Sequence, residues 1–392
     1  MTKTIGPVVQ RALILCGDKN ILAAVKSSLK KFEYGEIDHH ENGVEALKKM
    51  STSRYDVVVA HNKLKFISGW NLVKEMKISD KIPNMPVMLM GDLPAPVSED
   101  EMKQYGLVKY MKAPVNDSEL GMVLNSTMQL FKTSGTIENK FTKAKAALMG
   151  AKSAEAIELY SELHGLTKKN VRSSLGLAEA YTQDGQNDKA EALVLESLKS
   201  DASSPTAALL QIKIFINKKQ YSEANVAALT LLGPMADSPF YHVRVLNTFI
   251  EGKSLEHVEE ICRDAMGKRF KLPEFWNSMS RMLFQKNRYL DSLLILQSSV
   301  DEFGATAEMM NIKGACLRKE NRFDEALEAY EYALKLSPMD ARVYFNMAVC
   351  CISKKAIHDA KQHLEMCLKI TPDFPGAQQK LDEVNKFLGS VA

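Results

Sequence analysis

The distribution of apolar residues changes along the chain, and this change predicts two kinds of fold. Up to about residue 132, short apolar runs such as 56–60 and 86–90 alternate with stretches of helical periodicity such as 69–78. Buried strands that alternate with helices indicate a parallel sheet covered by helices on both faces. We therefore predict a doubly wound, five-stranded α/β domain at residues 10–132, preceded by a tail at residues 1–9.

After a linker at residues 133–136, the strand pattern stops and the sequence becomes helical with a period of 34 residues. Seven frames fit residues 137–374 without insertion or deletion, and a capping helix and tail follow at 375–392. Small residues predominate at the eighth and twentieth positions, and larger ones at the twenty-fourth. Because small residues let helices approach closely, each frame predicts a helical hairpin, and stacked hairpins form an α-solenoid. The frames begin at Ile137, Val171, Pro205, Pro239, Pro273, Ala307 and Ala341.

Composition narrows the class of protein. The chain has 392 residues, of which 45% are hydrophobic and 25% charged, as in globular proteins of more than one domain. Its apolar runs are far shorter than the roughly 18 residues of a membrane helix. The net charge of +3 does not favour nucleic acid as a partner. Six cysteines without a C-x-x-C pair or zinc spacing indicate core thiols in a reducing compartment, so we expect a cytoplasmic protein.

The repeat pattern resembles the tetratricopeptide repeat, most clearly in the frames that contain Trp276 and Tyr330. In that family, the second, fifth, ninth and twelfth positions of each first helix line a concave groove. The resemblance therefore implies a mixed groove with a slight bias toward acidic ligands, suited to an amphipathic helix or an extended peptide. Any one of these residues could instead pack against a neighbouring hairpin or the first domain. The groove candidates are Phe141, Lys145, Arg172, Lys213, Phe240, Asn247, Asn277, Arg281, Phe284, Asn311, Arg318, Arg342 and Phe345.

Residues 10–132 resemble the receiver domain of response regulators through four segments, 41–47, 55–60, 68–70 and 110–114. A working receiver holds Mg²⁺ with an acidic pair after its first strand and accepts a phosphoryl group on an aspartate after its third. It also uses a hydroxyl residue after the fourth strand and a lysine before a proline, which offset the phosphoryl charge.

Each of these positions is changed in this sequence. The acidic pair is replaced by Cys16 and Gly17, with Asp18 next to them, and the acceptor position holds His61. The hydroxyl position falls on Gly91 and the lysine position on Ala113, with Lys112 one residue away. The resemblance therefore implies a pseudo-receiver without metal or phosphoacceptor. We expect His61 to be a loop-end histidine that hydrogen-bonds locally.

These patterns together predict a non-catalytic bacterial signalling adaptor. Its pseudo-receiver would act without phosphorylation, its groove would bind a protein, and it would use no cofactor or metal. The surface around residues 98–105 and 109–120 could form a homodimer. Two alternatives stay open: a response regulator phosphorylated at a non-standard acceptor, and a regulatory enzyme such as a phosphatase acting on a partner.

Overall fold

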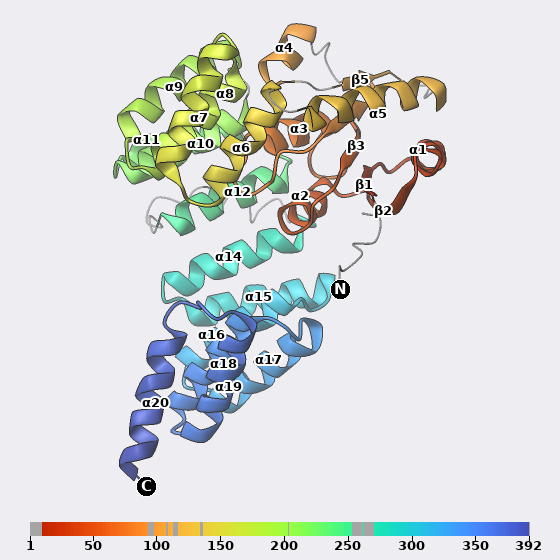
Figure 1. Ribbon diagram of the computed structural model, residues 1–392. Coiled ribbons are helices and arrows are strands. Elements are labelled where there is room, and N and C mark those ends of the chain that lie inside the picture. Colours follow the sequence, from red (N-terminus) through yellow and green to blue (C-terminus); the bar gives the residue numbers. More distant parts are fainter. Residues whose placement is uncertain are drawn as a thin grey trace, which may run out of the picture. The chain divides into compact units, whose positions relative to one another are not determined.

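The computed structural model describes residues 10–92, 98–106, 109–112, 117–133, 136–202, 204–252, 261 and 270–391. It divides into two compact units, Met1–Thr248 and Phe249–Ala392. Figure 1 shows the elements of both units. Among the described residues, no helix combines the length and the apolar character needed to cross a membrane.

The first unit begins with a doubly wound α/β domain, which confirms the predicted fold class. Its five strands are all parallel, in the order β2-β1-β3-β4-β5. Helices α1 and α5 cover one face of the sheet, and α2 and α3 lie on the other. The strands are β1 (Gln10–Leu15), β2 (Tyr34–His40), β3 (Val57–His61), β4 (Val87–Met90) and β5 (Lys109–Met111). The helices are α1 (Lys19–Lys31), α2 (Gly43–Thr52), α3 (Gly69–Ile78), α4 (Glu99–Gln104) and α5 (Asp117–Lys132).

Burial explains which strands are apparent from the sequence. The central strand β3 has neighbours on both edges and helices on both faces, so its residues 57–60 are fully buried valine and alanine. The edge strand β2 pairs only with β1 and is largely half-buried or exposed. It consequently carries polar residues and has no apolar run, although its register with β1 is continuous from Arg11 to Leu15.

The rest of the chain consists of helical hairpins, as the 34-residue period predicts. The first helices of the hairpins begin at the seven residues that open the frames. They are α6 (Ile137–Met149), α8 (Val171–Gln183), α10 (Pro205–Asn217), α12 (Pro239–Glu251), α14 (Pro273–Gln285), α16 (Ala307–Lys319) and α18 (Ala341–Ser353). The described second helices are α7 (Ser153–Leu166), α9 (Asn187–Ser200), α11 (Tyr221–Leu232), α15 (Tyr289–Phe303), α17 (Phe323–Leu336) and α19 (Ile357–Ile370), and α20 (Ala377–Val391) follows.

Two backbone features recur in the frames. The residue before a first helix is often a side-chain cap, as Thr136, Asn170 and Ser204 are, and it accepts a hydrogen bond from a free N–H of the first turn. The fifteenth position of each described frame has a left-handed backbone that turns the chain from the first helix into the second. The φ angles are 53° at Ala151, 79° at Gly185, 61° at Lys219, 58° at Asn287, 59° at Asn321 and 64° at Lys355.

The two units have their own hydrophobic cores. In the first unit, Phe141, Tyr160 and Leu177 belong to one cluster of the hairpins. In the second unit, Tyr330 lies against Gly314, where a Cβ atom would overlap its ring. The pairing of a glycine in the first helix with a tyrosine in the second brings the two helices close together.

Candidate functional site

At the carboxyl end of β1, the residues predicted to replace the acidic pair have other structural roles. Cys16 is buried, and burial raises the pKa of its thiol. Asp18 is the N-cap of α1, where its Oδ1 accepts hydrogen bonds from the backbone N–H groups of Asn20 (2.8 Å) and Ile21 (3.1 Å). Since Gly17 has no side chain, Asp18 is the one carboxylate that these three positions offer, and it is engaged in capping a helix.

His61, the residue at the predicted acceptor position, ends β3, and its ring lies over Gly91. The backbone N–H of Lys63 donates a hydrogen bond to Nδ1 of His61 at 3.2 Å, so the lone pair of that nitrogen is engaged. Gly91 has a φ of 92°, and a Cβ atom there would overlap Nε2 of His61. The imidazole therefore occupies space that a serine or threonine side chain after β4 would need.

The loop between β3 and α3 is held closed by Asn62. Its Nδ2 donates to the carbonyl oxygen of Asp92 at 2.9 Å, and its Oδ1 accepts from the backbone N–H of Trp70 at 3.0 Å. Gly69 approaches this loop so closely that a Cβ atom would lie 2.5 Å from the carbonyl oxygen of His61. The start of α3 is thus attached directly to the strand end that carries the acceptor position.

These residues do not fit the Mg²⁺ of a working receiver. The ion requires several oxygen ligands in near-octahedral geometry, and carboxylates are its usual protein ligands. Within the part of the chain that the structure describes, no three His, Cys, Asp or Glu side chains form a group able to hold a metal ion. Lys112 is exposed, and Ala113 lies outside the described residues.

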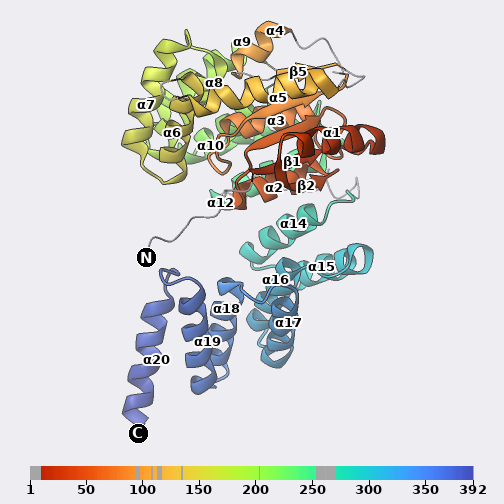
Figure 2. The ribbon, with the colours of Figure 1, turned by 45° about the vertical axis from the view of Figure 1, so that its right-hand side comes forward.

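Helix α3 of the receiver-like domain lies against first helices of the hairpins in the first unit. Residues Leu72 to Ile78 are all buried, because one face of α3 covers the sheet and the other contacts α8 and α10. Figures 1 and 2 both place α3 between the sheet and the helices α6, α8 and α10. Three predicted groove residues, Phe141, Lys145 and Arg172, are at most 2% exposed in this contact. They therefore do not form a free peptide surface.

The first cluster of this contact surrounds Lys74 of α3. Its Nζ lies 2.7 Å from Oδ2 of Asp201, which follows α9, and 3.1 Å from Oε1 of Glu101 in α4. Tyr105 donates from its hydroxyl to Oδ2 of Asp201 at 2.7 Å and is also hydrogen-bonded to Ser204 at 2.8 Å. Lys74 is only 3% exposed, so its charge is balanced inside the contact rather than by solvent.

The second cluster surrounds Glu138 of α6. Arg172 donates from Nη1 to Glu138 and from Nη2 to Oδ1 of Asn84 at 3.0 Å, and its guanidinium stacks 3.6 Å from the ring centre of Phe141. Nζ of Lys77 lies 3.6 Å from the Glu138 carboxylate. Burial disfavours the Glu138 carboxylate, but Arg172 and Lys77 outweigh this effect and hold its pKa at about 2. Burial also lowers the pKa of Lys77 to about 8, against the attraction of Glu138.

Other predicted groove residues of the first unit are also engaged. Lys145 donates from Nζ to the carbonyl oxygen of Met76 in α3. Lys213 pairs with Glu179 at 2.5 Å. Phe240 of α12 is buried with its ring 5.0 Å from that of Tyr241, and Asn247 is half-buried.

In the second unit, the predicted groove residues keep partial exposure. Arg281, Phe284, Arg318 and Phe345 are half-buried, and Arg342 is exposed and paired with Asp340 at 2.7 Å. Two asparagines bridge neighbouring first helices. Asn277 of α14 lies 3.5 Å from Oε2 of Glu308 in α16, and Asn311 of α16 accepts from Nδ2 of Asn346 in α18 at 2.8 Å. These contacts place the fifth positions of α14 and α16 on the side where the first helices adjoin.

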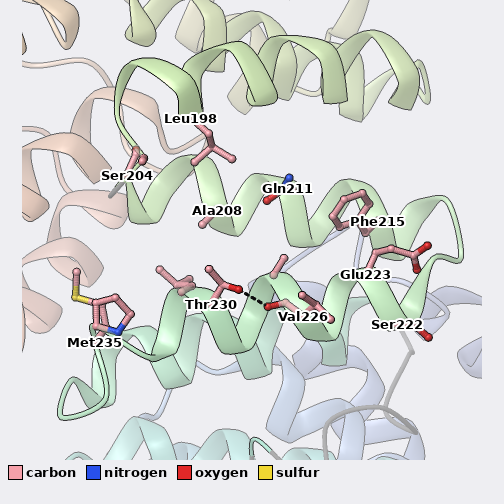
Figure 3. A pocket seen from close by; sticks show the side chains of 14 residues that line it. Leu198, Ser204, Ala208, Gln211, Phe215, Ser222, Glu223, Val226, Thr230 and Met235 are labelled. Atoms are coloured by element: carbon pink, nitrogen blue, oxygen red, sulfur yellow. Dashed lines mark hydrogen bonds between the residues drawn. The ribbon is translucent and has the colours of Figure 1, made fainter.

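A cavity of about 590 Å³ opens beside α9, α10 and α11 of the first unit. Figure 3 shows an elongated space with α10 on one side and α11 on the other, Glu223 near one end and Met235 near the other. Its lining is largely aliphatic, and it includes Ser204, which also holds Tyr105 of the receiver-like domain. No local pattern in the sequence indicates this space, because residues of three helices line it together.

The roles of Lys74, Lys77, Asn84 and Asp201 are not apparent from the sequence. On an isolated amphipathic helix, lysines opposite the apolar face are expected to be solvated. The pairs that these residues form between the receiver-like domain and the repeats join positions 54 to 127 residues apart in the sequence. No local pattern identifies pairs of this kind.

Comparisons with known proteins agree with this architecture. The family model described as response regulator receiver domain matches residues 13–125. Models of the tetratricopeptide repeat match residues 147–214, 277–341 and 317–381.

Individual relatives match parts of the chain. The Hsp70-Hsp90 organizing protein of Triticum aestivum is 30% identical over 76 residues, 19% of this chain and 13% of that protein. The peroxisomal targeting signal receptor of Candida glabrata is 29% identical over 158 residues, 37% of this chain and 26% of that protein. The chain thus matches well under half the length of these relatives. The crystal structure of the yeast Tom70 has a TM-score of 0.52 at 13% identity and covers 80% of this chain and 69% of that one, a likeness of fold.

Proposed function

Because the chain carries a response regulator receiver domain followed by tetratricopeptide repeats, we propose that it is a non-catalytic adaptor of a bacterial signalling pathway, active in the cytoplasm. The pairing of these modules supports a signalling protein that works through protein–protein contacts. In our proposal the receiver acts without phosphorylation, and the groove of α14, α16 and α18 binds a protein partner.

The absence of phosphorylation rests on one observation, the ring of His61 lying over Gly91. A phosphoryl group at this strand end would need space, a metal and a cationic partner. The imidazole occupies part of that space, and its Nδ1 accepts the hydrogen bond of Lys63. Asp18, the one carboxylate of the former metal position, is already a helix cap.

We propose the groove of the second unit as the binding site because the predicted groove residues of the first unit are buried. Since α3 covers Phe141, Lys145 and Arg172, a free ligand has no access to them while the receiver is docked. The half-buried Arg281 and Arg318 of the second unit offer two cations. Guanidinium groups on such a surface suit a segment that carries carboxylates.

The first experiment tests phosphorylation. The purified chain is incubated with acetyl phosphate and Mg²⁺ and separated on a phosphate-affinity gel, with a working receiver as the positive control. We expect no shifted band. A shifted band that disappears in His61→Ala would overturn the proposal and establish a non-standard acceptor.

The second experiment tests the groove. Proteins captured by the wild type are compared with those captured by the Phe284→Glu, Arg318→Glu double variant. Arg322→Glu is the matched control, because Arg322 is an exposed residue that pairs with Glu325 at the start of α17. We expect partners to be lost only in the double variant. Capture that is equal in all three proteins would remove the interaction from this groove.

A further inference from the structure

We propose that the groove of α6, α8 and α10 is a binding site for a helix that carries the pattern Lys-Glu-X-Lys, and that α3 is its resident ligand. A partner helix with the same pattern would enter the groove when the receiver undocks. This site is separate from the groove of the second unit, so it goes beyond the function proposed above.

The residues of α3 that face the repeats lie on one side of the helix. Lys74 and Lys77 are spaced by three residues, which places them on a common face, and both meet acidic residues of the repeats. Leu72, Val73 and Met76 are buried in the same helix. The repeats therefore contact α3 through a defined polar face, as a groove contacts a helical peptide.

Residues of α6 and of segments beside the groove, Asp201 after α9 and Arg244 in α12, meet the charges of this face in order. Lys74 meets Asp201 at 2.7 Å, Glu75 meets Arg244 of α12 at 3.1 Å, and Lys77 meets Glu138 at 3.6 Å. A helix with acids in place of the lysines would put like charges together in a region shielded from water. This arrangement selects a helix that carries a lysine, a glutamate and a second lysine three positions after the first.

Several buried polar groups at this contact lack a hydrogen bond in the described part of the chain. Buried polar atoms at it have no hydrogen-bond partner among the described residues: Oε2 of Glu75, Nζ of Lys77 and Nε of Arg172. Lys145, also buried here, has a pKa far below its usual value because of burial and the nearby Arg172 and Lys77. Undocking would return these groups to water, which offsets part of the lost contact and makes the association reversible.

The test uses the full-length protein and a fluorescent peptide of residues 68–81, which spans α3. Its affinity is measured by anisotropy for the wild type and for Lys74→Ala, Lys77→Ala, in which the groove is intact but its resident helix is weakened. We expect the double variant to bind the peptide at least tenfold more tightly. A peptide with glutamate at both lysine positions should not bind. Equal affinity of wild type and variant, or of the two peptides, would overturn the proposal.

Hydrogen exchange on the same proteins separates undocking from unfolding. In the double variant, β1 and β3 should stay protected while α8 and α10 exchange faster than in the wild type. If α8 and α10 stay as protected as in the wild type and the peptide does not bind, the groove does not open and the proposal is wrong.

A variant on the repeat side keeps the test valid if the lysine variant fails to fold. Arg244 is 34% exposed in its side chain, so Arg244→Glu changes a partly solvated position and brings two carboxylates together. This variant should bind a peptide carrying Glu75→Lys more tightly than the natural peptide, and the wild type should show no such preference. If both proteins prefer the same peptide, the repeats do not select the helix by the charge of its residues.

Discussion

At the scale of single residues, Gly91 after β4 determines which side chain fits at the end of β3. Gly91 has a left-handed backbone, and the imidazole of His61 occupies the volume where a Cβ atom would be. The residues at the predicted acceptor and hydroxyl positions, His61 and Gly91, are therefore physically connected. A histidine at the end of β3 needs a residue without a side chain at the end of β4.

We predict that Gly91→Ala lowers the free energy of unfolding by roughly 1–3 kcal/mol, through backbone strain and overlap with the ring. In a His61→Ala background the overlap is removed, so the same change should cost about 1 kcal/mol. Urea denaturation measures both. Gly17→Ala is the control, since nothing lies within 4 Å of a Cβ atom there. An equal cost in both backgrounds would contradict this account of the site.

Buried and exposed ion pairs in the chain differ in what their removal costs. Arg172→Met leaves the Glu138 carboxylate buried without its main partner, so we expect a loss of about 3–5 kcal/mol. Glu138→Gln in the same protein should recover part of it, because the uncompensated charge disappears. Arg322→Met removes an exposed pair with Glu325 and should cost less than about 1 kcal/mol. Chemical denaturation of the four proteins checks the order, which similar losses for Arg172→Met and Arg322→Met would refute.

At the scale of elements, the hairpins depend on the turn at the fifteenth position of each frame. The residues there are alanine, glycine, asparagine and lysine, although the backbone is left-handed in every described case. Only glycine adopts this conformation without steric strain, and asparagine tolerates it better than most residues. The packing of the two helices therefore imposes a conformation that the local sequence does not always favour.

Two exchanges at this position should have opposite effects. Gly185→Ala introduces a Cβ atom into open space, so its cost, about 1 kcal/mol, comes from the backbone alone. Ala151→Gly relieves the same strain and should stabilise the protein by up to about 1 kcal/mol. Shifts of the melting temperature in opposite directions would support this view. Destabilisation by both changes would mean that glycine flexibility in the unfolded chain outweighs the relief of strain.

At the scale of the whole molecule, the boundary between the two folds and the boundary between the two compact units lie at different residues. The chain changes from α/β to helical hairpins at residue 137, but the compact units divide between Thr248 and Phe249. The first hairpins belong with the receiver because α3 contacts them. Part of the surface predicted for dimerisation is also used in this contact, since Tyr105 is buried against Asp201 and Ser204. Light scattering after size exclusion would decide whether the remaining surface forms a dimer.

The two units should respond differently to acid. The pKa of Glu138 is about 2 in the folded protein and near 4.5 when exposed, so the unfolded chain binds more protons between these values and stability falls as pH drops through them. The difference corresponds to about 3 kcal/mol. In calorimetry we expect two transitions, of which one shifts strongly from pH 4.5 toward pH 2. Glu138→Gln should reduce that shift, and Tyr330→Ala should lower only the other transition. A single transition that both variants shift equally would argue against separate units.

Several features of the fold could be read from the sequence for physical reasons. Buried central strands such as residues 57–60 must be apolar, and small residues must recur where hairpin helices approach, so both patterns are local. The edge strand β2 was harder to identify, because half of its surface meets solvent and permits polar residues. Gly376 has a φ of 76°, so α20 begins only at Ala377, two residues after the predicted start at Pro375.

For the candidate sites, too, features that depend on local sequence were predictable and features that depend on tertiary packing were not. The sequence alone determined the two modules and the period of the repeats, because these depend on residue type and spacing. Only the tertiary structure decided that His61 lies over Gly91 and that α3 occupies the first groove. Pairs such as Lys74 with Asp201 are 127 residues apart. Packing between distant segments buries these charges. The sequence does not indicate whether a given charged side chain will be surrounded by water or by another protein surface.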